Sequence, residues 1–189
     1  MDTIVKIDGL WDEGFAIDKY VKKSEYIGDD IFGHPQFNTT YTPIGELLHS
    51  MKYNGHINTS ESIVDICIKF LTKWLSDKNI DIIIPIPPTI ERTHQPVYMI
   101  TEVISNKMHI PYATNILQKV SKIPAKNMNK NNKNMHGSIA KLKLATNYCN
   151  ILLVDDLYST GSTANECVSV LKKDPLIKNV YYLAIAKTK

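Results

Sequence analysis

The chain has 189 residues, of which 43% are hydrophobic and 22% are charged, and its formal net charge at pH 7 is +3. This length and apolar content suffice for one substantial core, with at most a small accessory segment. The small net charge counts against nucleic-acid binding, and the absence of a signal peptide or of an apolar run of about 20 residues predicts a cytoplasmic protein without membrane association.

The first 58 residues are predicted to form an accessory segment. Residues 3–9 and 14–21 resemble short strands, whereas residues 25–38 predict an irregular loop because Gly, Asp and Pro recur in them. Thr42 and Pro43 predict the start of a short helix, with Thr42 as its N-cap. Gly55 lies just past the expected end of this helix.

From residue 59 to residue 189 the pattern alternates between helices and strands. Asn58 and Glu61 resemble a capping box, and a helix with one apolar face is expected after them. Further helices are expected from Pro96 to about residue 105 and over residues 162–172. Strands are expected at residues 80–88, 113–118, 150–156 and 179–187. This alternation predicts an α/β fold with a parallel sheet and helices on both faces.

The sequence ILLVDDLYSTGST, residues 151–163, places two adjacent carboxylates at the end of a buried strand. In parallel sheets, ligands bind at the carboxyl ends of the strands. The backbone amides and hydroxyls of residues 159–163, ahead of a helix, predict a site for a phosphate monoester. Asp155 and Asp156 would then face ribose hydroxyls with a hydrated Mg²⁺ nearby. In the alternative interpretation, Asp156 caps the helix and Asp155 is a solvated strand end.

This stretch closely resembles the 5-phosphoribosyl 1-diphosphate (PRPP) signature of type I phosphoribosyltransferases. The resemblance implies a parallel central sheet flanked by helices, with residues 1–58 as a small N-terminal hood and residues 59–189 as the core. It implies that Asp155 and Asp156 hold the ribose and, through water, Mg²⁺. The residues that it assigns to the 5-phosphate are Ser159, Thr160, Gly161, Ser162 and Thr163.

A second segment, IIIPIPPTIERTHQP at residues 82–96, resembles the pyrophosphate loop of the ComF-like branch of this family. Arg92 and Gln95 match the branch pattern, whereas Thr93 replaces a glycine and His94 stands where the branch has asparagine. The resemblance implies a diphosphate site made by Pro87, Pro88, Thr89 and Arg92. In the alternative interpretation, Arg92 is only a surface charge at a helix start.

The segment TPIGELLHSMKYNGH, residues 42–56, resembles the helix that precedes the core in ComF-like proteins. This resemblance implies that Lys52 lies near the diphosphate site. ComF-like proteins commonly begin with a zinc-binding, cysteine-rich segment, whereas residues 1–50 of this chain contain no cysteine. The N-terminal segment therefore departs from that branch, and a role in DNA uptake is not implied.

The polar stretch at residues 121–137 corresponds in position to the mobile catalytic loop of the family. Its lysines, Lys122, Lys126, Lys130 and Lys133, favour a basic lid that closes over the diphosphate. Two alternatives are a disordered segment and a weak nucleic-acid contact, although five asparagines dilute the charge.

Taken as a member of this family, the chain is expected to transfer the phosphoribosyl group of PRPP to an unidentified nitrogenous acceptor. Asp155, Asp156 and Arg92 are the expected catalytic residues and Mg²⁺ is the expected cofactor. Ser159 stands where the hypoxanthine/guanine enzymes have an aspartate, which counts against that substrate class. Two alternatives stay open: a non-catalytic sensor of PRPP or nucleotides, and a component of a multiprotein system. Whether the chain forms a homodimer or binds a protein partner is also left open.

Overall fold

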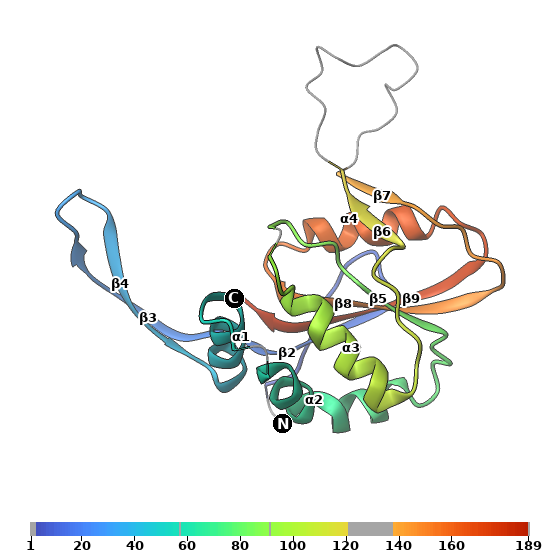
Figure 1. The fold of residues 1–189 in the computed structure, drawn as a ribbon, viewed down its shortest axis with the longest axis horizontal. Helices are drawn as coiled ribbons and strands as arrows, with labels where there is room; N and C mark the ends of the chain where they lie inside the picture. The colour runs from blue at the N-terminus through green and yellow to red at the C-terminus, as the bar shows by residue number, and fades with distance from the viewer. Residues whose placement is uncertain (1–2, 57, 91, 121–137, 189) are drawn as a thin grey trace, which may run out of the picture.

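The computed structural model describes residues 3–56, 58–90, 92–120 and 138–188 (Figure 1). A five-stranded sheet with the order β1-β2-β9-β8-β5 forms its centre. The neighbours β2, β9, β8 and β5 run parallel, and β1 is antiparallel to β2. The strands are β1 (Val5–Lys6), β2 (Glu13–Lys19), β5 (Ile82–Pro85), β8 (Cys149–Tyr158) and β9 (Ile177–Lys187). The predicted α/β fold with a mostly parallel sheet is confirmed.

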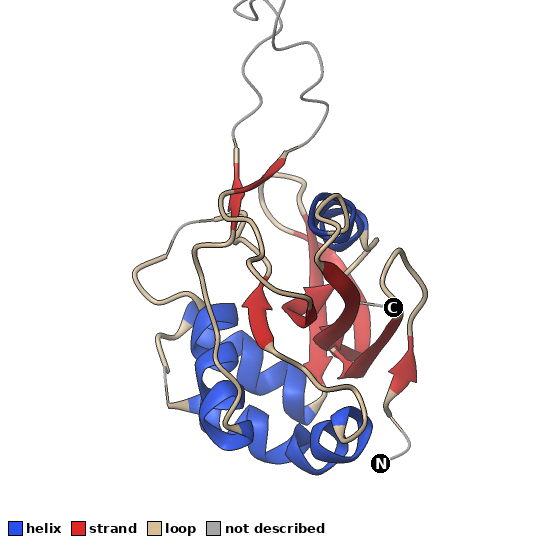
Figure 2. Cartoon of the chain, turned by 90° about the vertical axis from the view of Figure 1, so that its right-hand side faces the viewer, coloured by secondary structure: helices blue, strands red, loops and turns tan. Residues whose placement is uncertain are grey.

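Helices cover both faces of this sheet (Figure 2). Three lie on one face and α4 lies on the other, with bounds α1 (Pro43–Tyr53), α2 (Thr59–Leu75), α3 (Pro96–Met108) and α4 (Ser162–Leu171). In β8, Leu152 and Val154 pack into the core beneath the first three helices, whereas Ile151 and Leu153 pack beneath α4. Because successive side chains of a strand point to opposite faces, a strand covered on both sides must be apolar throughout.

The four helices begin where the sequence predicts, and only the capping at Asn58 differs. The hydroxyl of Thr42 accepts a 3.0 Å hydrogen bond from the amide of Gly45, as expected of an N-cap. Helix α3 begins at Pro96, as predicted. The capping box at Asn58 is wrong, because Asn58 has helical dihedral angles and its side chain makes no capping hydrogen bond. An N-cap side chain needs an extended backbone to reach back to the first amides.

The N-terminal segment contributes directly to the central sheet. Strand β2 pairs in parallel with β9, with Ala16 opposite Ala184, and Ala16 is completely buried. Strands β1 and β2 and helix α1 therefore belong to the main body, and the division at residue 58 stays a prediction. Burial of the apolar residues of β2 against the edge of β9 accounts for this placement.

Residues 25–38 are not an irregular loop, and this prediction is wrong. They belong to a hairpin of β3 (Val21–Asp29) and β4 (Pro35–Tyr41) that projects away from the main body (Figure 1). The glycines and Pro35 lie at a bulge, in the turn and at a strand start, where they are compatible with pairing. The carboxylate of Asp30 accepts hydrogen bonds from the amides of Phe32 and His34 and closes the turn.

A short ribbon of β6 (Leu117–Lys119) and β7 (Ile139–Lys141) lies beside α4 (Figure 1). The strand predicted at residues 113–118 thus begins later than expected. Residues 121–137, with the predicted loop lysines Lys126, Lys130 and Lys133, lie outside the described residues. None of the helices described for this chain is long and apolar enough to span a membrane.

Candidate functional site

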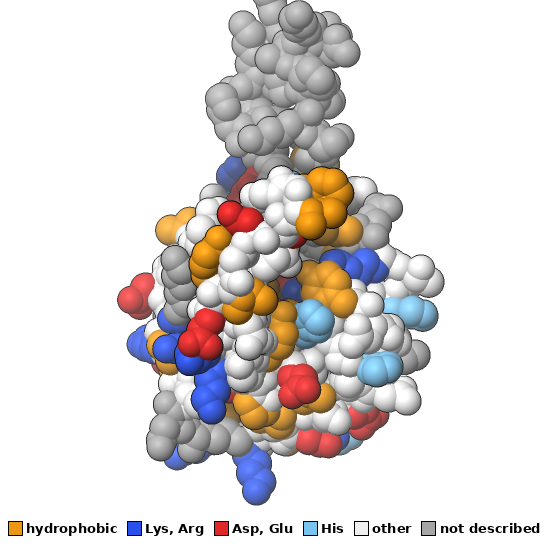
Figure 3. Space-filling model, turned by 90° about the vertical axis from the view of Figure 1, so that its left-hand side faces the viewer, with side chains coloured by type: hydrophobic (Ala, Val, Ile, Leu, Met, Phe, Trp, Pro, Cys, Tyr) orange, Lys and Arg blue, Asp and Glu red, His pale blue; other side chains and the backbone are white. Residues whose placement is uncertain are grey.

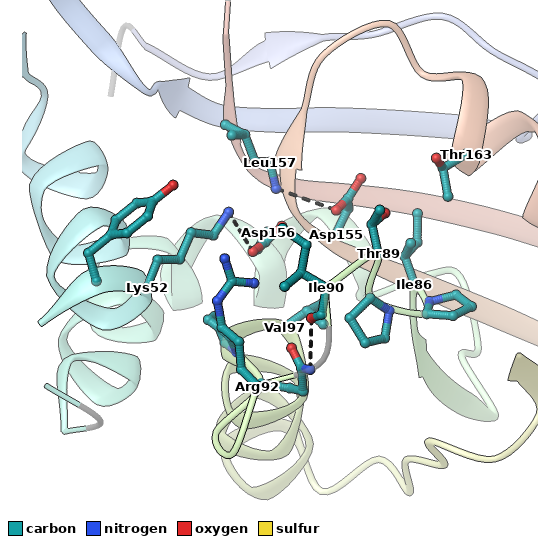
Figure 4. A pocket seen from close by; sticks show the side chains of 15 residues that line it. Lys52, Ile86, Thr89, Ile90, Arg92, Val97, Asp155, Asp156, Leu157 and Thr163 are labelled. Carbon is teal, nitrogen blue, oxygen red and sulfur yellow. Dashed lines mark hydrogen bonds and ion pairs between the residues drawn. The ribbon is translucent and has the colours of Figure 1, made fainter. Parts of the chain in front are cut away.

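A pocket of about 320 Å³ opens at the carboxyl ends of β5 and β8 (Figure 4). This is the edge at which parallel sheets bind ligands. Its lining includes an apolar floor and a set of polar and charged side chains from separate segments. The sequence-predicted residues that line it are Lys52, Pro87, Pro88, Thr89, Arg92, Asp155, Asp156 and Thr163.

The different lengths of β5 and β8 create this pocket. The last paired residue of β5 is Pro85, opposite Val154, and β8 continues to Tyr158. Pro87 and Pro88 have no amide hydrogen to donate, so the chain leaves the sheet there. Every peptide bond among the described residues is trans, including those of this loop. The two aspartates of β8 therefore lie beyond the end of β5 and line the pocket.

Asp155 is held in an environment that disfavours its charge. Its carboxylate accepts a 2.8 Å hydrogen bond from the Tyr182 hydroxyl and a 3.4 Å hydrogen bond from the Leu157 amide. Burial, followed by the adjacent charge of Asp156, raises the pKa of Asp155 to about 7. A further group that carries positive charge or donates hydrogen bonds would stabilise the ionised form. A bound cation or a set of ligand hydroxyls would do so.

Tyr182 and Trp11 support Asp155 and were not identified from the sequence. The rings of Trp11 and Tyr182 are stacked with centroids 4.3 Å apart, and the Trp11 indole N–H donates to the carbonyl of Ile7. Burial raises the pKa of Tyr182 well above its ordinary value, so this hydroxyl stays a donor. Alternation along β9 could have placed Tyr182 on the α4 face, but no local spacing links Trp11 to it.

Asp156 forms an ion pair with Lys52. The Lys52 ammonium lies 2.7 Å from the Asp156 carboxylate, and the two side chains are only 11% and 21% exposed. Lys52 comes from the last turn of α1, whose carbonyl end favours a cation. The alternative in which Asp156 caps α4 is wrong, because the N-cap of this helix is Gly161 and it has no side-chain cap.

The loop from Ser159 to Thr163 reaches the rim of the pocket at Thr163. Gly161 has a φ of +75°, and a Cβ at this position would lie 2.8 Å from the Tyr158 ring, so the turn requires glycine. The hydroxyls of Thr160 and Ser162 lie 2.9 Å apart, whereas Thr163 lines the pocket itself. Exposed hydroxyls and the first amides of α4 together make this rim suited to an anion.

Two further cations border the pocket. Arg92 points into it (Figure 4), and none of the carboxylates described for this chain forms an ion pair with it. Lys119, at the end of β6, donates a 2.9 Å hydrogen bond to the hydroxyl of Thr89. Lys119 was missed because its proximity depends on how the β6–β7 ribbon docks. Glu166 of α4 holds the start of β7 in place, because its carboxylate accepts hydrogen bonds from the amide and hydroxyl of Ser138.

The donor set fits a metal ion carried by a ligand better than a resident one. No cluster of three or more His, Cys, Asp or Glu side chains that could hold a metal occurs in the part of the chain that the structure describes. Mg²⁺ commonly binds through one or two carboxylates, water and substrate phosphates. Asp155 and Asp156 supply such a pair.

The comparisons with known proteins give one short sequence match and structural neighbours of low similarity. No family model matches the sequence. A stretch of 69 residues is 33% identical to "Transcriptional regulator GfcR" of Methanocaldococcus jannaschii, and the match covers 34% of this chain and only 33% of that protein.

Solved phosphoribosyltransferases are among the structural neighbours. The adenine phosphoribosyltransferase of Leishmania tarentolae matches 98% of this chain and 94% of its own length, with a TM-score of 0.46 and 11% identity. The enzyme of the same name from Saccharomyces cerevisiae gives a TM-score of 0.42, 12% identity and coverages of 86% and 83%. Leishmania donovani UMP synthase gives a TM-score of 0.40 and 16% identity. The match covers 87% of this chain and 28% of the length of that protein. At these identities, and at TM-scores below 0.5, the likeness assigns no activity to this chain.

Proposed function

We propose that this chain is a phosphoribosyltransferase of type I that binds PRPP with Mg²⁺ and transfers the phosphoribosyl group to a nitrogenous acceptor. One observation carries the proposal. A single pocket combines the aspartate pair at the end of β8, the Pro87–Thr89 loop with Arg92, and Thr163 from the hydroxyl-rich turn. Assignment to the ComF-like branch stays a prediction.

Each part of the pocket suits one part of PRPP. The hydroxyls of residues 159–163 and the start of α4 would bind the 5-phosphate. Asp155 and Asp156 would hold the ribose hydroxyls and the hydrated Mg²⁺, which supplies positive charge to the diphosphate. Arg92, with the loop that contains Thr89, would bind the diphosphate, and Lys119 lies next to this loop.

The transfer would need few proton-transferring side chains. The bond from C1 of the ribose to the diphosphate oxygen breaks, a bond from C1 to the acceptor nitrogen forms, and that nitrogen loses a proton to water or to the departing diphosphate. The diphosphate leaves with the electron pair of the broken bond. The residues of the pocket would position the reactants and stabilise the charge that develops on the diphosphate. Ser159 cannot act as the base that deprotonates the acceptor.

Calorimetric titration of PRPP, with and without Mg²⁺, tests the ligand. Binding in the low micromolar range or tighter is expected for the wild type. The double variant Asp155→Asn/Asp156→Asn should bind at least tenfold more weakly, or about 1.4 kcal/mol. A folded wild-type protein that does not bind PRPP would falsify the proposal.

A second candidate is a regulator that senses PRPP without turning it over, alone or within a multiprotein system. The 69-residue match to a transcriptional regulator favours it, although that match spans a third of each protein. Diphosphate release separates the two functions. An enzyme releases diphosphate with at least one nitrogenous acceptor of a panel, whereas a sensor binds PRPP and releases none with any acceptor.

A further inference from the structure

A second pocket, of about 330 Å³, opens at the amino ends of β5, β8 and β9, at the opposite end of the sheet from the candidate functional site. Protein interiors contain few voids larger than a water molecule, whereas ligand pockets begin at about this volume and are mostly apolar. We call this cavity the amino-end pocket. The apolar side chains that line it come from separate segments and include Ile82, Ile84, Ile116, Leu144, Ile151 and Ile177.

Residues 142–148, between β7 and β8, form one wall of the amino-end pocket. The amide of Leu142 donates a 2.8 Å hydrogen bond to the carbonyl of Ile116. Three residues further on, the amide of Ala145 donates a 2.8 Å hydrogen bond to the carboxylate of Asp174. Both bonds form without a ligand, so the wall is already in place. A ligand that enters a preformed pocket loses less of its binding energy to ordering the protein.

Two apolar side chains of this wall are open to solvent. Leu144 is 82% exposed and Tyr148 is 64% exposed, and both line the pocket. Exposed apolar side chains also lie on the side of the molecule from which the hairpin projects (Figure 3), and Ile31 in the hairpin turn is 93% exposed. Leu144 and Tyr148 differ from Ile31 because they border a cavity. A flat apolar molecule in the cavity would therefore cover both side chains.

The charged side chains of the amino-end pocket favour an anionic group on the ligand. Lys141 is ion-paired with Asp174, and the carboxylate of Asp81 accepts a 2.8 Å hydrogen bond from the amide of Asn150. Lys143 also lines the pocket and is exposed, and none of the carboxylates described for this chain forms an ion pair with it. Its ammonium is thus available to a ligand at the mouth of the pocket.

We propose that the amino-end pocket binds a small planar apolar molecule that carries one carboxylate. The apolar walls would enclose the rings, and the ammonium of Lys143 would bind the carboxylate. The ammonium of Lys178 lies 4.6 Å from the centroid of the Tyr148 ring and adds positive charge to the same rim. A bicyclic carboxylate of about 13 non-hydrogen atoms should bind with a dissociation constant of about 0.1–1 mM. This inference does not depend on PRPP binding.

A titration of the full chain with naphthalene-2-carboxylate, followed by ¹H–¹⁵N NMR, tests the ligand class. The neutral 2-naphthalenemethanol should bind about three- to fivefold more weakly, because an exposed ion pair contributes an effect of this size. The Lys143→Met variant should bind the carboxylate and the alcohol equally. The matched control is Lys22→Met, which removes an exposed lysine of the hairpin and should keep the preference for the carboxylate.

The apolar wall is tested with a second pair of variants. Leu144→Ser should weaken the binding of both naphthalene compounds at least threefold, because less apolar surface is then buried against the rings. Ile31→Ser removes a side chain of similar size and exposure from the hairpin turn, outside the amino-end pocket. It should bind both compounds as the wild type does.

Cys149 gives a readout that is specific to this pocket. It lines the pocket and is partly exposed, whereas the other two cysteines of the chain, Cys67 and Cys167, are completely buried. Iodoacetamide should therefore alkylate only Cys149 in the folded protein. Burial raises the pKa of the Cys149 thiol, so the reaction is followed at about pH 8.5 by mass spectrometry. Naphthalene-2-carboxylate at about ten times its dissociation constant should slow the alkylation at least fivefold.

The proposal is overturned if naphthalene-2-carboxylate does not bind at about 5 mM, or if it binds and leaves the alkylation rate of Cys149 unchanged. Equal affinities of the wild type for the carboxylate and the alcohol would overturn it as well, as would wild-type binding by Leu144→Ser. Circular dichroism establishes that each variant is folded. If Leu144→Ser does not fold, Lys143→Met and the protection of Cys149 still decide the question.

Discussion

The central sheet carries a pocket at each end, and the two pockets differ in chemistry rather than in size. The pocket at the carboxyl ends of β5 and β8 has a volume of about 320 Å³ and is lined by charged residues from separate segments. The pocket at the amino ends of β5, β8 and β9 has a volume of about 330 Å³ and is largely apolar, with Ile82, Ile116 and Leu144 among its lining. Volume alone would not have distinguished them. The two pockets are distinguished by the strand ends at which they lie and by the charged residues that line the first of them.

An aspartate near each pocket shows what this difference means. At the amino end, Asp174 accepts hydrogen bonds from Lys141 and from the amides of Ala145 and Leu176. These bonds lower the pKa of Asp174 to about 2. At the carboxyl end, burial and a neighbouring carboxylate raise the pKa of Asp155 to about 7. The surroundings of Asp174 therefore favour its charged form, whereas those of Asp155 disfavour it.

The largest expected effect comes from Lys52. Lys52→Met removes a buried cation and leaves Asp156 as an uncompensated negative charge facing the anionic ligand. PRPP should bind about 30-fold more weakly, or about 2 kcal/mol, by calorimetry. Lys143→Met is the matched control, because Lys143 lines the other pocket. Equal losses in both variants would show that the effect is general electrostatics and not the site.

Gly161→Ala tests the turn that precedes α4. The φ of +75° and the contact with the Tyr158 ring oppose a Cβ at this position. Urea unfolding should show a loss of about 1.5 kcal/mol, and PRPP binding should also weaken. Gly55→Ala is a useful control, since its φ is +68° but a Cβ there meets no neighbouring atom within 4 Å. A loss of stability equal to that of the control would remove the argument that the Tyr158 contact matters.

Asp155→Asn should stabilise the unliganded protein while weakening PRPP binding. The pKa of Asp155 in the folded state, about 7, lies above the unfolded value of about 3.9. Ionisation of Asp155 therefore costs folded-state stability, and the cost is absent below pH 4 and complete above pH 7. The variant should gain about 1 kcal/mol over the wild type at pH 8, and the gain should vanish at pH 4. A gain that is the same at both pH values in urea unfolding would contradict this explanation.

The residues of the site that could be predicted from sequence lie in continuous segments. Asp155, Asp156 and the turn to Thr163 follow a buried strand directly, so local pattern and strand polarity were enough to place them. Lys52 was placed by resemblance only, because no spacing connects α1 to the end of β8. Tyr182 could not be assigned to Asp155 before it was known that β9 lies beside β8.

The hairpin of β3 and β4 could not be predicted from the sequence. Its glycines and Pro35 predict a loop, but Gly28 lies at a bulge and Gly33 lies in the turn. The strands between them are held by cross-strand pairs such as Tyr26 with Phe37. Glycine and proline residues alternate closely with strand-forming residues in this segment. The residue pattern alone therefore does not distinguish a loop from an irregular hairpin.

Lys119 is expected to have a smaller effect than Lys52. Lys119→Met removes a positive charge that does not line the pocket itself. The Lys119 ammonium contacts a lining residue, because it donates a hydrogen bond to the Thr89 hydroxyl. Diphosphate and PRPP should each bind about threefold more weakly, or about 0.7 kcal/mol, and Lys119→Arg should restore most of the affinity. Thr89→Val should reproduce the loss if the hydrogen bond is what matters. Additive losses in the Lys119→Met/Thr89→Val double variant would show that the two side chains act separately.

The smallest expected effect is the pH response at the other end of the sheet. The folded-state pKa of Asp174, about 2, lies below the unfolded value of about 3.9, so its interactions stabilise the fold above pH 4 and are lost as the pH falls toward 2. The double variant Lys141→Met/Asp174→Asn avoids an unpaired buried lysine and lacks this titration. Between pH 5 and pH 2.5 the thermal midpoint of the wild type should fall about 3 °C further than that of the variant. Parallel curves would mean that Asp174 titrates normally. The contrast between the pKa values of the two aspartates would then rest on Asp155 alone.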